Sequence, residues 1–134
     1  MHHIIKLPIE CFPLNDRLTV AELQQRWNNA LILTQAAVIR QPDVYRELKC
    51  LAGDIVTKPL DITEYMPAAR RLMKLFEKMD PNGKGSIFQL FNDRINPSSI
   101  WDVCWLRLEC KDMLAHLEVF DKWRLKHGRL KIVK

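Results

Sequence analysis

The chain has 134 residues, 48% of them hydrophobic, and a formal net charge of +5 at pH 7. A chain of this length buries enough apolar surface for one domain, residues 1–134, without a metal or a disulfide. Its apolar runs are too short to cross a membrane, and its first residues lack the continuous apolar core of a signal peptide. The composition therefore predicts a cytoplasmic domain with no membrane partner.

The spacing of the cysteines is typical of a protein in a reducing compartment. Cys11, Cys50, Cys104 and Cys110 stand at unrelated spacings, and three of them fall within apolar helical patterns. Such residues are typical of buried free thiols rather than of disulfides or metal ligands. We therefore expect no disulfide framework, no metal site and no cofactor.

The positive charge is concentrated at the C-terminal end of the chain. Six of the 21 lysines and arginines lie in residues 122–134, which contain no acidic residue. The remaining bases are matched by 16 acidic residues, so the rest of the chain is close to neutral. We define residues 125–134 as the basic tail. Leu130 and Ile132 alternate there with basic residues, which is typical of a strand, whereas a basic terminus by itself is typical of disorder.

Residues 1–18 show no helical period. Pro8 and Pro13 favour an extended chain, and residues 3–7 are a candidate short strand. If the basic tail also forms a strand, residues 4–7 are its expected pairing partner. We therefore predict short extended termini, with β-pairing between them as one of the two alternatives.

The first predicted helix starts after Thr19. Thr19 and Glu22 form a T-x-x-E capping box, a common start signal for a helix. From Val20 to Val38 the apolar residues recur with the helical period, and Pro42 stops the pattern. The sequence predicts an amphipathic helix of about 20 residues here.

Pro42 also suits the first turn of a second helix, which we expect to be short and to end near Gly53. A connector containing Pro59 follows. Asp61 or Thr63 can cap a third helix, whose regular part should start at residues 66–67 because proline is tolerated in a first turn.

The longest predicted helix covers Ser99–Arg124, after a turn at residues 80–83 and a short helix or turn over residues 88–93. At about 100° per residue its apolar side chains fall on two opposite faces. The first face contains Val103, Leu106, Cys110, Met113, Leu114, Leu117 and Phe120. The second face contains Trp101, Cys104, Trp105, Leu108, Ala115 and Val119. The apolar side chains of both faces must pack against other side chains, so this helix should lie at the centre of the domain.

One stretch resembles a known chemical motif. After a helix, the chain carries two oxygen ligands, a turn glycine and an apolar residue at positions 1, 3, 6 and 8 of a loop: Asp80, Asn82, Gly85 and Ile87. This pattern resembles the start of an EF-hand calcium loop. Lys84 at position 5 and Phe91 at position 12 depart from the EF-hand pattern, since a ligand oxygen and a bidentate carboxylate belong there. A turn that ends a helix is the simpler interpretation, and we predict no calcium site.

No constellation of residues predicts an enzyme. The serines lie at turns and caps, and none stands in a G-x-S-x-G pattern. Cys104, Cys110 and His116 project in three directions around the long helix, so they cannot converge on one metal ion. With four glycines in the chain, no phosphate-binding glycine loop is present either.

Two kinds of binding function remain. The preferred one is protein binding through the second face of the long helix, with candidate residues Trp101, Trp105, Leu108 and Asp112. Tryptophan is favoured at binding hot spots, and the acidic Asp112 within this face indicates incomplete burial. The structural alternative is that other helices cover both faces.

The second kind is nucleic-acid binding through basic residues, with candidate residues Arg70, Arg71, Lys126, Arg129, Lys131 and Lys134. Such a surface binds phosphates without sequence preference. Against it, the chain contains no helix-turn-helix, zinc or aromatic RNA-binding motif.

The sequence as a whole predicts an all-α, single-domain bundle of four to five helices around a long C-terminal helix. The preferred function is a non-enzymatic adaptor or regulatory protein whose partner is another protein or a second copy of this chain. A nucleic-acid-binding accessory factor is the alternative.

Overall fold

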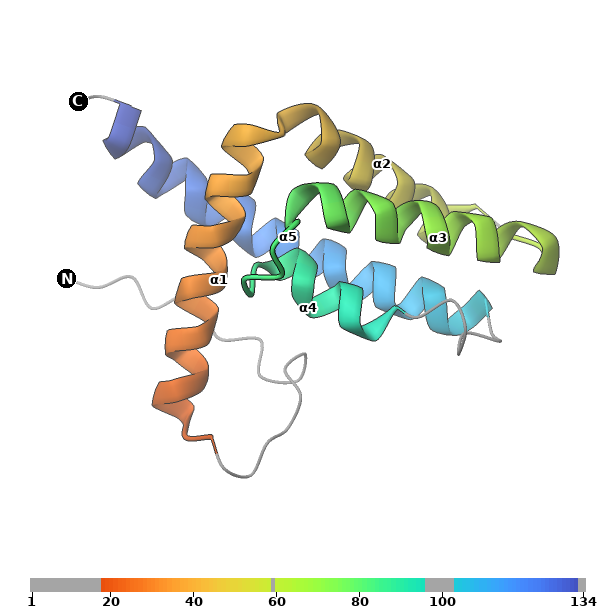
Figure 1. The fold of residues 1–134 in the computed structure, drawn as a ribbon, viewed down its shortest axis with the longest axis horizontal. Coiled ribbons are helices and arrows are strands. Elements are labelled where there is room, and N and C mark those ends of the chain that lie inside the picture. Colours follow the sequence, from red (N-terminus) through yellow and green to blue (C-terminus); the bar gives the residue numbers. More distant parts are fainter. Residues whose placement is uncertain (1–17, 59, 96–102, 133–134) are drawn as a thin grey trace.

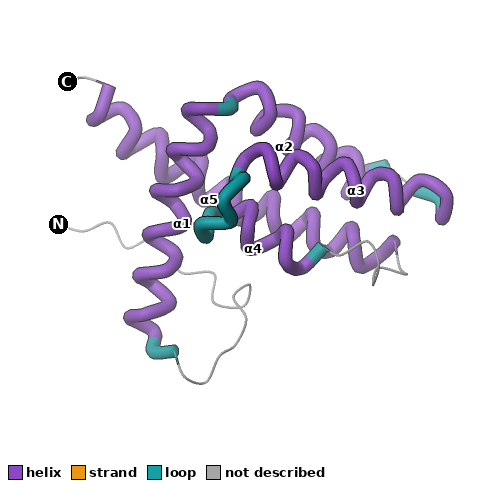
Figure 2. Tube along the Cα trace, in the orientation of Figure 1, coloured by secondary structure: helices purple, strands orange, loops and turns teal. Residues whose placement is uncertain are grey.

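The computed structural model describes residues 18–58, 60–95 and 103–132, all of which belong to α-helices or to the connections between them. Figure 1 shows the five helices of these ranges, and Figure 2 shows no strand in them. In chain order they are α1 (Val20–Arg40), α2 (Pro42–Thr57), α3 (Ile62–Met79), α4 (Ile87–Arg94) and α5 (Val103–Ile132). The prediction of an all-α bundle with a long C-terminal helix is confirmed.

Helices α2, α3, α4 and α5 lie side by side, and α1 crosses one end of this group (Figure 1). Helix α2 packs against both α3 and α5, while α4 fills the space beside α5. The C-terminal end of α5 projects beyond α1, and the first turns of α1 project from the bundle in another direction (Figure 1).

The core contains side chains from all five helices. The first face of α5 supplies five fully buried residues: Leu106, Cys110, Met113, Leu117 and Phe120. The other helices add both aliphatic side chains and aromatic rings, and of these rings Trp27 from α1, Phe76 from α3, and Phe88 and Phe91 from α4 are all fully buried. Burial of such side chains is the main contribution to the stability of a domain of this size.

The start of α1 follows the sequence prediction. The backbone N–H of Glu22 donates to the Thr19 hydroxyl across 3.1 Å, and the Glu22 carboxylate accepts from the Thr19 backbone N–H in return. At the other end of α1, Pro42 is the first residue of α2, where its missing N–H leaves no hydrogen bond unmade.

Two predicted helix boundaries are wrong. Helix α2 continues through Gly53 to Thr57, because Ala52 and Ile55 bury apolar surface on either side of the glycine and outweigh its low helix propensity. Helix α3 starts at Ile62, ahead of Pro67. The Asp61 carboxylate accepts from the backbone N–H groups of Thr63 and Glu64, and this cap stabilises the turn before the proline. 

Helix α5 continues through Gly128 to Ile132 and so includes part of the basic tail. The pairing of the two termini stays a prediction. Extending an existing helix by one residue avoids the unfavourable nucleation step, and basic residues near a helix C-terminus interact favourably with its dipole. Residues 4–7, the expected strand partner of the tail, lie outside the described residues, as do the predicted cap Ser99 and Trp101.

Candidate functional site

The two faces of α5 differ sharply in exposure. Five residues of the first face, from Leu106 to Phe120, are fully buried and Leu114 between them is partly buried, whereas on the second face Trp105 is 47% exposed and Leu108 is 61% exposed. Ala115 and Cys104 on the second face are exposed as well. Trp105 and Leu108 are thus among the large apolar side chains that the described helices leave exposed.

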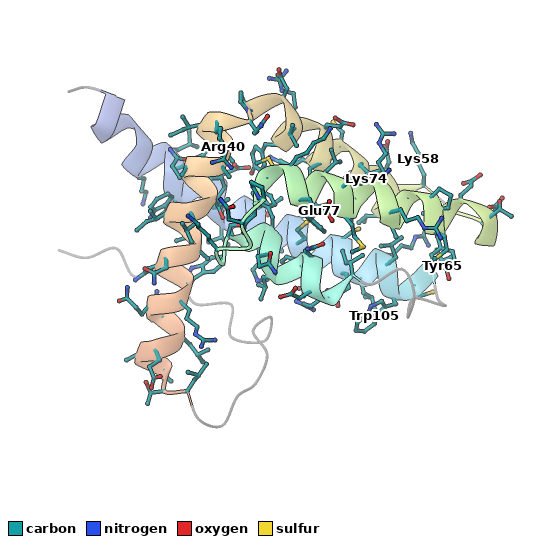
Figure 3. The ribbon with its side chains drawn as sticks, in the orientation of Figure 1. Arg40, Lys58, Tyr65, Lys74, Glu77 and Trp105 are labelled. Atoms are coloured by element: carbon teal, nitrogen blue, oxygen red, sulfur yellow. The ribbon has the colours of Figure 1, made fainter. Side chains whose placement is uncertain are left out.

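The exposed face points away from α2. Arg107 lies on the opposite side of α5 from Trp105, and its guanidinium donates to the carbonyl oxygens of Ile55 and Lys58 at the end of α2. Figure 3 shows Trp105 at the edge of the bundle, on the other side of α5 from α2. The helix that packs most extensively on α5 therefore leaves this face uncovered.

The second face is a regular stripe. Its residues recur at alternating intervals of three and four, at Trp105, Leu108, Asp112, Ala115 and Val119. This interval is the spacing at which two α-helices pack along a common seam. Further along α5 the same spacing reaches two exposed bases, Lys122 and Lys126. We call the set from Trp105 to Lys126 the α5 stripe; it is apolar at one end and basic at the other.

Asp112, the acidic residue of the stripe, is held by an ion-pair network. One terminal nitrogen of Arg94, on α4, lies 2.9 Å from Glu109 and 3.2 Å from Asp112. Glu109 is 2% exposed, and burial raises the pKa of its carboxyl group while the charge of Arg94 opposes this shift. Asp112 therefore contributes to the α4–α5 contact, and its half-buried carboxylate adds little charge to the stripe.

His116 is part of the core. It is 2% exposed, its Nδ1 lies 2.8 Å from the Asp112 carbonyl oxygen, and the rings of Trp27 and Phe91 meet it edge to face. Burial also raises the pKa of the Cys110 thiol, to about 12. Among the described residues no group of His, Cys, Asp and Glu side chains could hold a metal ion.

The basic candidates of the sequence do not form one surface. Arg70 and Arg71 are exposed on α3, and Arg71 pairs with Glu47 of α2 across 2.8 Å. Lys126 lies on the end of α5 that projects past α1, away from α3 (Figure 1). Residues 129 and 131 continue the same helix, and Lys134 lies outside the described residues.

In the loop that resembles an EF-hand, the first acidic residue, Asp80, accepts hydrogen bonds from the turn itself. One Asp80 oxygen accepts from the Lys84 backbone N–H, and the other accepts from the backbone N–H and the hydroxyl of Ser86. Gly85 has a φ of 90°, in the left-handed region that favours glycine. Asp80 thus closes the turn between α3 and α4, and α4 begins at Ile87, where an EF-hand would still be in its loop.

Sequence reasoning missed a cleft of about 420 Å³ at the corner between α1 and α2. Its lining residues are Val38, Pro42, Tyr45, Arg46, Lys49, Cys50 and Arg124. The cleft joins the end of α1 and the start of α2 to a residue of α5 more than 70 positions away. No periodicity or spacing in the sequence could have revealed such a site, because it depends on how α5 crosses the corner.

Comparison with known proteins completes the description. No described helix is both long enough and apolar enough to cross a membrane. The chain matches no protein-family model, and neither the curated proteins nor the solved structures give a significant match.

Proposed function

We propose that this protein is a non-enzymatic adaptor or regulatory protein that binds a helix of another protein along the α5 stripe. The observation that carries this proposal is the exposure of Trp105 and Leu108 on the side of α5 opposite its buried face. Both side chains stand on a rigid helix, so they reach a partner without a loss of backbone freedom.

The spacing and charge of the stripe define the partner. Alternating intervals of three and four suit an amphipathic α-helix with apolar residues at the same intervals. Lys122 and Lys126 extend the stripe and favour acidic residues at the end of the partner helix that packs near them. The expected partner is therefore an acidic amphipathic helix.

The cysteines support a reducing, cytoplasmic setting for this adaptor. Cys50 and Cys104 have exposed thiols, so the prediction of buried thiols is wrong for these two residues. Exposed thiols persist in the reduced form where glutathione and thioredoxin keep them so.

Photo-crosslinking tests the proposal directly. The photoreactive amino acid p-benzoylphenylalanine replaces Leu108 in one variant and Ile39, an equally apolar residue of α1 that is 70% exposed, in a control variant. Each is irradiated in a nuclease-treated extract of the source cells, and the crosslinked peptides are identified by mass spectrometry. We expect the Leu108 position, and not the Ile39 position, to crosslink to one acidic, amphipathic helical segment.

A second pair of variants measures the binding energy. Leu108→Glu should weaken capture of the crosslinked partner at least tenfold, because burying one unpaired carboxylate costs more than 1.4 kcal/mol, or about a factor of ten. Ile39→Glu should leave capture unchanged. Crosslinks from Leu108 to nucleic acid, to a second copy of this chain, or to the same proteins as Ile39 would each overturn the proposal.

A further inference from the structure

The cleft between α1, α2 and α5 presents positive charge. The charged residues that line it are Arg46, Lys49 and Arg124, all of them cations. The nearest acidic residue of α5, Asp121, does not line the cleft. Its carboxylate accepts from the Tyr45 hydroxyl across 2.8 Å and pairs with Lys49 across 2.7 Å.

Arg124 is fixed in position before any ligand arrives. Its guanidinium lies over the rings of Tyr45 and Phe120, and its Nε lies 3.5 Å from Asp121. Its two terminal nitrogens make no hydrogen bond with a described residue, so they are available for a ligand. A guanidinium that is already ordered loses little freedom on binding, and its planar donors match the oxygens of a phosphate.

The other two cations each pair with one carboxylate, Arg46 more loosely than Lys49. Arg46 pairs with Asp43 across 3.2 Å, but both side chains are largely exposed, and such a pair contributes at most about 1 kcal/mol. Lys49 is only partly buried beside Asp121. A dianion in the cleft would interact with all three cations, against a partial opposing effect of Asp43 and Asp121, which pair with them but do not line the cleft.

The rest of the lining gives the cleft a second, apolar part. Val38 and Pro42 supply an apolar wall, and the volume of about 420 Å³ is within the range of small-ligand sites. We propose that this cleft binds the phosphate of a nucleotide unit, with the phosphate on the three cations and the base or sugar against the apolar wall. This site is independent of the α5 stripe, because Arg124 and the stripe lie on different sides of α5.

The exposed cysteines provide the test. Cys50 lines the cleft and Cys104 lies outside it, on the N-terminal part of α5. The chain is treated with iodoacetamide, an uncharged reagent, in the presence of inorganic phosphate, ATP or a 20-nucleotide oligothymidylate. Mass spectrometry then gives the alkylation rate at each cysteine. We expect ATP, the oligonucleotide or both to slow alkylation of Cys50 at least fivefold and to leave Cys104 unchanged, with inorganic phosphate weaker than either.

Charge reversal shows whether the cations are responsible. Arg46→Glu should raise the ligand concentration for half-protection of Cys50 about tenfold, the loss expected for one charge-assisted hydrogen bond. Arg70→Glu changes the net charge equally but lies on α3, outside the cleft, and should have no effect. Far-UV circular dichroism confirms that both variants are folded.

The outcomes separate the sources of the phosphate. Protection by ATP indicates a free nucleotide, and protection by the oligonucleotide alone indicates a nucleic-acid strand. Equal slowing at Cys50 and Cys104, no slowing by ATP or by the oligonucleotide, or an equal effect of Arg46→Glu and Arg70→Glu would overturn the proposal. Leu108→Glu should leave Cys50 protection intact, so this result stands or fails apart from the adaptor function.

Discussion

Arg94 on α4 and Glu109 on α5 form an ion pair of 2.9 Å in which the Glu109 side chain is almost completely buried. The same Arg94 nitrogen reaches Asp112, and the guanidinium lies over the ring of Phe91. This arrangement fixes α4, the shortest described helix, against α5. It also sets the orientation of the α5 stripe, because Asp112 belongs to both.

Replacing Arg94 by alanine should destabilise the protein by about 3 kcal/mol, since it leaves a buried carboxylate without its counter-charge. The matched control is Arg71→Ala. Its pair with Glu47 has nearly the same length, 2.8 Å, and also joins two helices, but both side chains are largely exposed. That pair should contribute less than about 1 kcal/mol. Urea unfolding of both variants measures the difference, and equal losses would show that burial of Glu109 is unimportant.

Glu109 should also make stability depend on pH. Burial raises its pKa above the usual value of 4.5, so the folded state holds this proton more tightly than the unfolded state does. The resulting stabilisation is fully present below the unfolded pKa and is lost as the pH rises through the folded pKa. The free energy of unfolding of the native chain should therefore fall, relative to that of Glu109→Gln, as the pH rises from below 4.5 through the raised folded pKa. A difference that stays constant or grows over this interval would contradict the assignment.

The sequence was sufficient for most of the helical pattern. The capping box at Thr19, the first-turn proline at Pro42 and the buried face of α5 could all be predicted, because each depends on residues close in sequence. Helix boundaries predicted from local residue propensity were wrong where packing between helices, or the continuation of an existing helix, favoured a different boundary. Gly53 was expected to end a helix, yet it lies inside α2, since neighbouring buried residues outweigh a cost of about 1 kcal/mol for the glycine.

The sequence predicted the residues of one candidate site but not those of the other. Periodicity identified Trp105 and Leu108, but whether their face is exposed or is a second core face follows only once the other helices are placed. The ion pair of Arg94 with Glu109 spans 15 positions and no motif predicts it. The cationic cleft needs Arg46 and Arg124 together, a relationship that only the tertiary structure provides.

Replacement by alanine should affect stability much more at Trp27 of α1 than at Trp105 of α5. Trp27 is fully buried, so Trp27→Ala should lose about 3–5 kcal/mol of stability through the cavity that it leaves. Trp105 is 47% exposed, so Trp105→Ala should lose about 1 kcal/mol or less while abolishing partner capture. Thermal unfolding and the capture assay, applied to both variants, separate the two roles. A large loss of stability for Trp105→Ala would place this ring in the core.

The thiol of Cys110 should be inert in the folded protein. Burial raises its pKa to about 12, whereas the reactive species is the thiolate. In a variant whose other three cysteines are replaced by serine, an aromatic disulfide reagent should titrate no thiol until urea unfolds the chain. A variant that retains only Cys104, which is exposed, should react at once under native conditions.

Two glycines should respond oppositely to replacement by alanine. Gly53 lies inside α2, and a Cβ added there would meet nothing within 4 Å, so Gly53→Ala should stabilise the protein by about 0.5–1 kcal/mol. Gly85 has a φ of 90°, a conformation that alanine rarely adopts. Gly85→Ala should therefore destabilise by about 1 kcal/mol or more, although there is also open space around it. Because space is equal at the two positions, urea unfolding of this pair isolates backbone conformation as the cause. Equal effects of the two replacements would show that the turn closed by Asp80 accommodates alanine without strain.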